Sequence, residues 1–279
     1  MDVLIRLVRA SRWKGRGPLA MAASPTHCQQ DMRLLDRFRS AKSSFDAPIE
    51  PDRPFCAVGD IHGSAHLLEK MLNRLPGDLP VVFVGDYVDR GDDSAGVLRR
   101  LFEAQRTDPD RITCLMGNHE VFLLDFLDGS TRGGAAWLRH GGMQTLGSFG
   151  VQPPQTTDLT HTGWAVARQG LAAAMGSDMI GWIRSLPSVT QFGNVAVVHA
   201  GADPDLPMSM QRPEDLIWGH PDFAKVHRRD GVWVIHGHTI VADPVVRGGR
   251  ISIDTGAYAT GRLTAVVVKM GDTRFVTVD

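Results

Sequence analysis

The chain has 279 residues, of which 43% are hydrophobic and 22% are charged, and its formal net charge is −1. This balance is typical of a globular protein with apolar material for one large core, so one catalytic domain is the simplest expectation. Because the charges nearly cancel, the totals do not favour nucleic acid as a partner. No apolar run reaches the roughly 18 residues of a transmembrane helix, so we expect no membrane partner. The three cysteines form no closely spaced pair, which favours a reducing cytoplasm.

Residues 1–50 differ in composition from the rest of the chain. No acidic residue lies between Asp2 and Asp31, while Arg, Lys, Ser, Pro and Gly recur without periodicity. This composition predicts a basic, flexible N-terminal segment at 1–50 and a catalytic domain at 51–279. An organellar transit peptide, a phosphate-binding arm and a translation start at Met32 are alternative interpretations.

From Pro54 onward, short β-branched runs alternate with helical patterns, which predicts helices covering a largely parallel sheet. The first half should contain strands at 55–58, 81–84 and 112–116 and helices at 64–75, 94–104 and 120–127. Residues 129–191 are less repetitive and predict a helical insert with helices at 137–149 and 171–186 and a loop at 151–162. The last third predicts mixed or antiparallel strands at 195–198, 232–235, 250–254, 263–269 and 275–279.

Five of these strands end in polar clusters: GDIHG at 59–63, GDYVDRG at 85–91, GNHE at 117–120, HAG at 199–201 and HGHT at 236–239. Strands aligned in one sheet bring their ending loops into one crevice. Carboxylate oxygens, imidazole nitrogens and an amide oxygen are ligands for divalent Mn, Fe, Co or Zn. The clusters therefore predict a dinuclear metal site, whose candidate ligands are Asp60, His62, Asp86, Asn118, His199 and His238.

The order of these motifs resembles the calcineurin-like metallophosphoesterases. GDYVDRG with GNHE is similar to the bacterial branch of the PPP-type serine/threonine protein phosphatases. The resemblance covers about residues 54–279 and extends to WLRHGG at 137–142, EDLIW at 214–218 and DTGAYATGRL at 254–263. It implies an α/β fold, a four-layer α/β/β/α sandwich with mixed sheets and a helical insert.

The resemblance also implies how the ligands divide between two divalent ions, with manganese preferred. Asp60 and His62 would hold one ion, Asp86 would bridge, and Asn118, His199 and His238 would hold the second. Two ions about 3.5–4 Å apart would acidify a shared water into a nucleophilic hydroxide.

The catalytic roles fall on the GDYVDRG and GNHE motifs. Arg90 would neutralise the phosphoryl oxygens, and His119, kept protonated by Asp89, would donate a proton to the leaving group. A surface ion pair with Asp92 or Asp93 is the alternative for Arg90.

Substrate contacts are expected from further residues of the same resemblance. His236 and Tyr258 have the right neighbourhood, although His236 is alternatively a hydrogen-bonded core histidine and Tyr258 a residue that ends a strand. The EDLIW segment departs from the family because Gly219 follows it, where bacterial relatives place a phosphate-binding arginine. Arg228 or Arg229 would supply that charge, or His220 would substitute for it.

The sequence thus predicts a metal-dependent phosphomonoester hydrolase. A monomeric serine/threonine protein phosphatase acting on phosphorylated protein or a small phosphoester is the leading interpretation. A symmetrical dinucleoside polyphosphate (Ap4A) hydrolase is the alternative, disfavoured because aromatic residues that could stack on a base make up only 7% of the chain. A non-catalytic phosphate-binding scaffold has no chemical need of the complete ligand set.

Overall fold

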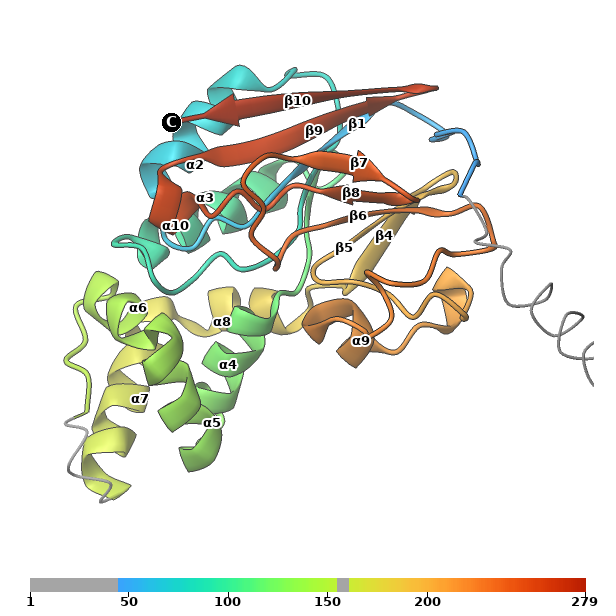
Figure 1. Ribbon diagram of the computed structural model, residues 1–279. Coiled ribbons are helices and arrows are strands. Elements are labelled where there is room, and N and C mark those ends of the chain that lie inside the picture. The colour runs from blue at the N-terminus through green and yellow to red at the C-terminus, as the bar shows by residue number, and fades with distance from the viewer. Residues whose placement is uncertain (1–44, 155–160) are drawn as a thin grey trace, which may run out of the picture. The chain divides into compact units, whose positions relative to one another are not determined.

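The computed structural model describes residues 45–154 and 161–279, and it has two mixed five-stranded sheets (Figure 1). The strand order of the first sheet is β10-β9-β1-β2-β3, and that of the second is β4-β5-β6-β8-β7. The first sheet contains β1 (Phe55–Val58), β2 (Val81–Phe83), β3 (Ile112–Cys114), β9 (Leu263–Lys269) and β10 (Asp272–Val278). The second contains β4 (Val189–Phe192), β5 (Val195–Val198), β6 (Trp233–His236), β7 (Val245–Arg247) and β8 (Arg250–Ser252).

Each central strand is buried on both faces, and alternate residues enter different cores. In β1, Cys56 and Val58 pack beneath helices α2 (Ala65–Arg74) and α3 (Ser94–Thr107), while Phe55 and Ala57 face the core between the sheets. In β5, the even-numbered residues turn away from that shared core toward Leu216 of α9 (Pro213–Trp218). Helix, sheet, sheet and helix therefore follow one another, which confirms the expected four-layer sandwich.

The expectation that all five motif-bearing strands share one sheet is wrong. Strands β1, β2 and β3 run parallel in the first sheet, whereas β5 and β6 run parallel in the second. Strands that are apolar on both faces look alike in sequence, so their pattern does not reveal which strands pair. The sheets nevertheless place the ends of these strands at one site.

A helical insert, defined here as α5 to α8, follows α4 (Asn118–Leu127) (Figure 1). The helix predicted at 137–149 is interrupted: α5 (Thr131–Trp137) continues into a π-helical turn (Leu138–Gly142) and α6 (Met143–Ser148), because Gly141 has a φ of 114°. The helix predicted at 171–186 is divided between α7 (His161–Met175) and α8 (Ser177–Arg184) by Gly176, whose φ is 79°. The loop predicted at 151–162 falls partly outside the described residues.

The short elements β4, β7, α9, α10 (Ala257–Thr260) and a single 3-10 turn (Met208–Met210) were not predicted. Of the basic segment expected at 1–50, residues 1–44 lie outside the described residues. Residues 45–50 are described and contact the second sheet: the ring of Phe45 lies 5.0 Å from that of Trp233, and Glu50 N–H donates to Asn194 Oδ1 at 2.7 Å. Among the described residues, no helix is long and apolar enough to cross a membrane.

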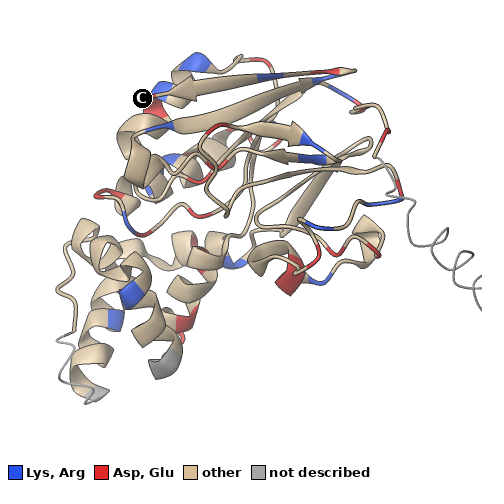
Figure 2. Ribbon diagram, in the orientation of Figure 1, with Lys and Arg blue, Asp and Glu red and all other residues tan. Residues whose placement is uncertain are grey.

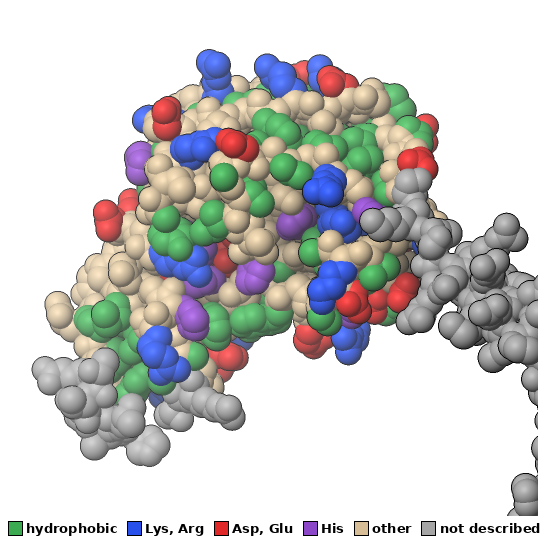
Figure 3. Space-filling view, in the orientation of Figure 1, with side chains coloured by type: hydrophobic (Ala, Val, Ile, Leu, Met, Phe, Trp, Pro, Cys, Tyr) green, Lys and Arg blue, Asp and Glu red, His purple; other side chains and the backbone are tan. Residues whose placement is uncertain are grey.

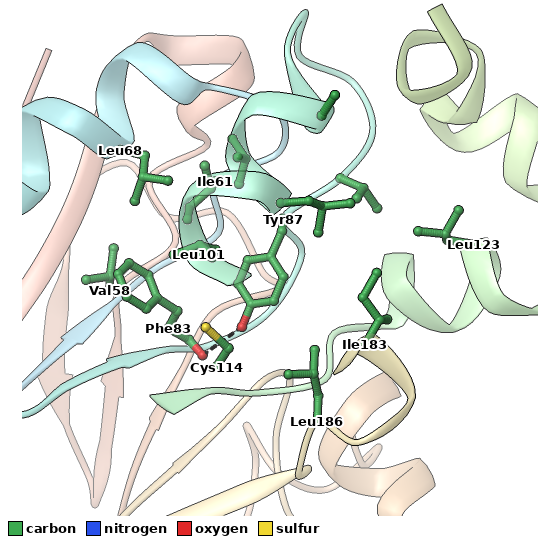
Figure 4. Packing of buried hydrophobic residues seen from close by; sticks show 14 of the residues in the cluster. Val58, Ile61, Leu68, Phe83, Tyr87, Leu101, Cys114, Leu123, Ile183 and Leu186 are labelled. Carbon is green, nitrogen blue, oxygen red and sulfur yellow. Dashed lines mark hydrogen bonds between the residues drawn. The ribbon is translucent and has the colours of Figure 1, made fainter. Parts of the chain in front are cut away.

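The core anchors the loop that follows β2. Tyr87 is fully buried beside Phe83 and Cys114 (Figure 4), and its hydroxyl donates to the carbonyl oxygen of Leu115 at 2.7 Å. Burial of such a ring supplies a large apolar contact, and the hydrogen bond satisfies its polar end. The residue beside it, Asp86, is thereby held in a fixed position.

Candidate metal centre and active site

Asp86 lies at the centre of the polar cluster. It comes after β2 with a left-handed φ of 53°, and it is 2% exposed. Its Oδ2 lies 3.4 Å from His62 Nε2, and its Oδ1 lies 3.4 Å from His199 Nε2. One carboxylate thus faces an imidazole on each side, the arrangement expected of a ligand that bridges two ions.

The Asn118 side chain lies between His199 and His238. Its Oδ1 is 2.9 Å from His199 Nε2 and 2.9 Å from His238 Nδ1. The Asp60 carboxylate accepts from the backbone N–H of His238 at 3.1 and 3.2 Å. The two sheets therefore bring together all six candidate ligands that the sequence indicated.

The donor set fits two divalent ions. Two clusters of potential ligand atoms share Asp86, one with His62 and His119 and the other with His199 and His238. Burial lowers the pKa of His62 to about 3 and that of His199 to about 4, so both imidazoles are neutral, as metal ligands must be. Burial, followed by the charges of Asp254 and Asp86, raises the pKa of Asp60 well above its usual value. Crowded buried carboxylates of this kind are stabilised by a cation.

His119 lies in the first turn of α4 with its two ring nitrogens facing different partners. Nδ1 is 2.6 Å from Asp89 Oδ2, whereas Nε2 faces the cluster, 3.9 Å from Asp86 Oδ2 and 3.2 Å from Arg90 Nη2. Burial acts to lower the pKa of His119, but the hydrogen bond to Asp89 and the charges of Asp86 and Asp89 raise it overall. The structure thus brings the predicted acid, its carboxylate partner and the predicted phosphate-binding arginine together.

Glu120 is a site residue whose role sequence reasoning missed. Its buried carboxylate accepts from the backbone N–H groups of Asp86, Tyr87, Val88 and Gly117, at 2.8, 2.8, 3.3 and 3.1 Å. It therefore fixes the loop that carries the bridging carboxylate. Its place in GNHE was the available signal, because a buried acid beside a metal-binding motif commonly orients the ligands.

Tyr258 lies at the mouth of the site. Its ring is 39% exposed, stands edge-on to His62 at 5.3 Å, and lies 4.8 Å from Arg90 Cζ. A cleft of about 360 Å³ opens beside these two side chains and is also lined by Ser64 and His66 at the start of α2. Arg90 is therefore held over an aromatic face at the site and does not form an ion pair with Asp92 or Asp93.

The structure places other expected substrate contacts elsewhere. Both ring nitrogens of His236 are engaged, one with Ser252 Oγ at 2.8 Å and one with the Gly237 carbonyl at 3.0 Å, so His236 is the hydrogen-bonded core histidine. Arg228 is buried, pairs with Asp230 and donates to the carbonyls of Asp203 and Leu206.

Two further candidates for the second phosphate contact have acidic residues near them. Arg229 lines a separate pocket with Pro204, Asp205 and Leu206, and His220 Nε2 lies 3.8 Å from Asp203 Oδ2. Arg228 is thus structural because its guanidinium is already satisfied, whereas Arg229 and His220 stay predictions for the second phosphate contact.

Arg228→Gln should therefore lower stability without changing substrate binding. Loss of buried charge-assisted hydrogen bonds is expected to reduce the free energy of unfolding by about 2 kcal/mol. Urea denaturation measures that change, and KM for an aryl phosphate should stay within about twofold. A large increase in KM with unchanged stability would restore Arg228 as a substrate ligand.

An aromatic wall, formed by Phe122, His140 and Trp218, stands beside His119. The rings of Phe122 and His140 stack at 5.4 Å and 8°, and Trp218 meets Phe122 edge-on at 5.0 Å. His140 is exposed and Trp218 is 42% exposed. The ring of His119 lies 6.0 Å from that of Phe122.

Charged residues are spread over the molecule, whereas histidines gather on one face. Acidic and basic residues are interspersed over both sheets and the helices (Figure 2), in keeping with the net charge of −1. Histidine side chains gather in the middle of one face, with Lys and Arg around them (Figure 3). That face presents a local concentration of groups suited to metal ions and phosphate.

Residues 53–242 match the model of the calcineurin-like phosphoesterase family. The chain belongs to this family. It is a metallophosphoesterase, and the His and Asp clusters around Asp86 are typical of the family's dinuclear metal site.

Curated relatives of this metallophosphoesterase divide between two substrate classes. The symmetrical bis(5'-nucleosyl)-tetraphosphatase of Ralstonia nicotianae is 28% identical over 75% of this chain and 87% of its own length. Serine/threonine-protein phosphatase 2 of Escherichia coli is 26% identical over 78% of this chain and 94% of its own length.

Solved structures share the fold. A proposed diadenosine tetraphosphatase superposes with a TM-score of 0.56 at 21% identity, covering 83% of this chain and 98% of that one. A cold-active protein-tyrosine phosphatase of a Shewanella species has a TM-score of 0.52 at 18% identity, covering 82% of this chain and 83% of that one. At these identities the likeness concerns the sandwich alone.

Proposed function

We propose that this metallophosphoesterase hydrolyses dinucleoside polyphosphates such as Ap4A. The aromatic wall beside His119 carries the proposal, because exposed rings next to the proposed proton donor offer a stacking surface for a base attached to the leaving phosphate. Stacking of a base on an aromatic side chain contributes about 1–3 kcal/mol. The low aromatic content, which favoured a phosphoprotein in the sequence, is outweighed by where these few rings stand.

The relatives support the same substrate class. The Ralstonia protein is named as a symmetrical bis(5'-nucleosyl)-tetraphosphatase. An asymmetrical bis(5'-nucleosyl)-tetraphosphatase, PrpE of Anoxybacillus flavithermus, is 25% identical over 75% of this chain and 88% of its own length. A serine/threonine protein phosphatase is the second candidate, supported by the length of the match to the E. coli phosphatase.

The arrangement of the site supports a role for each of its side chains during hydrolysis. Asp60, His62, Asp86, Asn118, His199 and His238 would hold two divalent ions, which supply Lewis-acid activation of water and neutralise phosphate charge. Arg90 donates to the phosphoryl oxygens from one side of the site. His119 Nε2 gives a proton to the departing oxygen, while Asp89 holds Nδ1 and so fixes the direction of Nε2.

Trp218→Ala tests the aromatic wall. Loss of one stacking surface should reduce kcat/KM for Ap4A by about tenfold and leave hydrolysis of phosphoserine, which has no base, nearly unchanged. Trp218→Phe, which keeps an aromatic face, should retain most of the activity on Ap4A. Equal losses on both substrates would instead mean that Trp218 supports the fold of the site, and the stacking proposal would fail.

A further inference from the structure

The turn at Asp89 and Arg90 is strained. Both residues have left-handed backbone angles, with φ of 73° and 67°. Such a conformation is unfavourable for a residue other than glycine, so it persists only where the surroundings hold it. This turn carries the carboxylate that contacts His119 and the guanidinium that faces the site.

Side chains of the helical insert surround the Asp89 carboxylate. The Trp137 indole N–H lies 2.9 Å from each Asp89 oxygen, and the Thr145 hydroxyl donates to Oδ1 at 2.7 Å. The backbone N–H of Asp89 donates to Thr145 Oγ1 at 2.9 Å and to Ser94 Oγ at 3.0 Å. Trp137 and Thr145 are fully buried.

The π-helical turn also brings the backbone of the insert into contact with the Asp89–Arg90 turn. The Gly141 carbonyl accepts from Arg90 N–H at 3.4 Å, and a Cβ at position 141 would lie 2.5 Å from that nitrogen. A Cβ at Gly142 would lie 2.4 Å from the Trp137 ring. The two glycines therefore permit the contact between insert and turn.

We propose that Trp137 and Thr145 are positioning residues that clamp the Asp89–Arg90 turn. By fixing the Asp89 carboxylate, they direct His119 Nε2 toward the leaving-group oxygen, so the helical insert sets the geometry of proton donation. The proposal goes beyond the substrate class, because it applies to any phosphoester whose leaving group needs a proton.

Three variants separate positioning from packing. Thr145→Val removes the hydroxyl at nearly constant volume, Thr145→Ser retains it, and Trp137→Phe removes the N–H while keeping a ring. Trp164→Phe is the matched control, because Trp164 is also buried in the insert against Phe126, yet its N–H has no hydrogen-bond partner among the described residues.

Phenyl phosphate, whose leaving group needs a proton, and dinitrophenyl phosphate, whose leaving group does not, report on the acid. For Thr145→Val and Trp137→Phe we expect kcat on phenyl phosphate to fall by about 10- to 100-fold, because small displacements of a catalytic group have effects of this size. On dinitrophenyl phosphate the loss should be less than about threefold. KM and metal content should not change, and Thr145→Ser and Trp164→Phe should resemble the parent protein.

Equal losses on both aryl phosphates, or losses that Trp164→Phe shares, would show general packing and overturn the proposal. Unchanged kinetics in both variants would overturn it as well. If a thermal melt shows that Thr145→Val does not fold, the comparison of Trp137→Phe with Trp164→Phe on the two aryl phosphates is enough to test the proposal.

Discussion

Asp86→Asn should abolish phosphoesterase activity on every substrate, with kcat/KM reduced by more than about 10⁴-fold. The reason is that one carboxylate faces His62 through one oxygen and His199 through the other. An amide offers one oxygen ligand and no charge, so it cannot bridge two cations. Metal analysis of the purified protein should find about two divalent ions per chain in the parent and about one or fewer in the variant.

The control for this experiment is a carboxylate outside the cluster. Asp128 is exposed and pairs with Arg184, so Asp128→Asn should leave activity and metal content as they are. Full activity of the parent protein after exhaustive chelation, or a content of one ion per chain, would refute the dinuclear centre.

His119→Asn should lower kcat by about 10²–10⁴-fold while the metal content stays intact, since the lost function is proton donation. Asp89 holds Nδ1 of His119 while Nε2 faces the site, so Nε2 is the nitrogen that donates the proton and the variant has no group to replace it. The effect should shrink as the pKa of the leaving group falls. Rates on a series of aryl and alkyl phosphates measure this dependence, and equal losses across the series would exclude His119 as the acid.

Local sequence patterns predicted the strands and the metal ligands because each depends on neighbouring residues. The runs at 55–58, 195–198 and 263–269 agree with β1, β5 and β9 in both bounds. The polar residues after the strands converge as expected. The assignment of the five motif-bearing strands to one sheet failed, because pairing depends on contacts between distant segments.

The residues around the ligands were harder to foresee. Trp137 and Thr145 reach Asp89 only because the π-helical turn and its glycines fold the insert against the turn, a contact with no short-range signal. Arg228 was proposed as a phosphate ligand from its position in the chain, yet its partners Asp203 and Leu206 lie more than twenty residues away.

The aromatic wall is another feature that the sequence did not predict, and it bears on the substrate. Phe122, His140 and Trp218 come from α4, the π-helical turn and α9, and composition alone could not place them together. Their position beside His119 is the reason why we propose a dinucleoside polyphosphate, and not a phosphoprotein, as the substrate.

A side-by-side measurement of kcat/KM on Ap4A and on phosphoserine and phosphothreonine peptides, with the same metal-loaded protein, tests this conclusion most directly. We predict that Ap4A is preferred by about tenfold or more, a difference of about 1.4 kcal/mol in transition-state stabilisation. A preference for the phosphopeptides of the same size would contradict the proposed substrate and support a protein phosphatase.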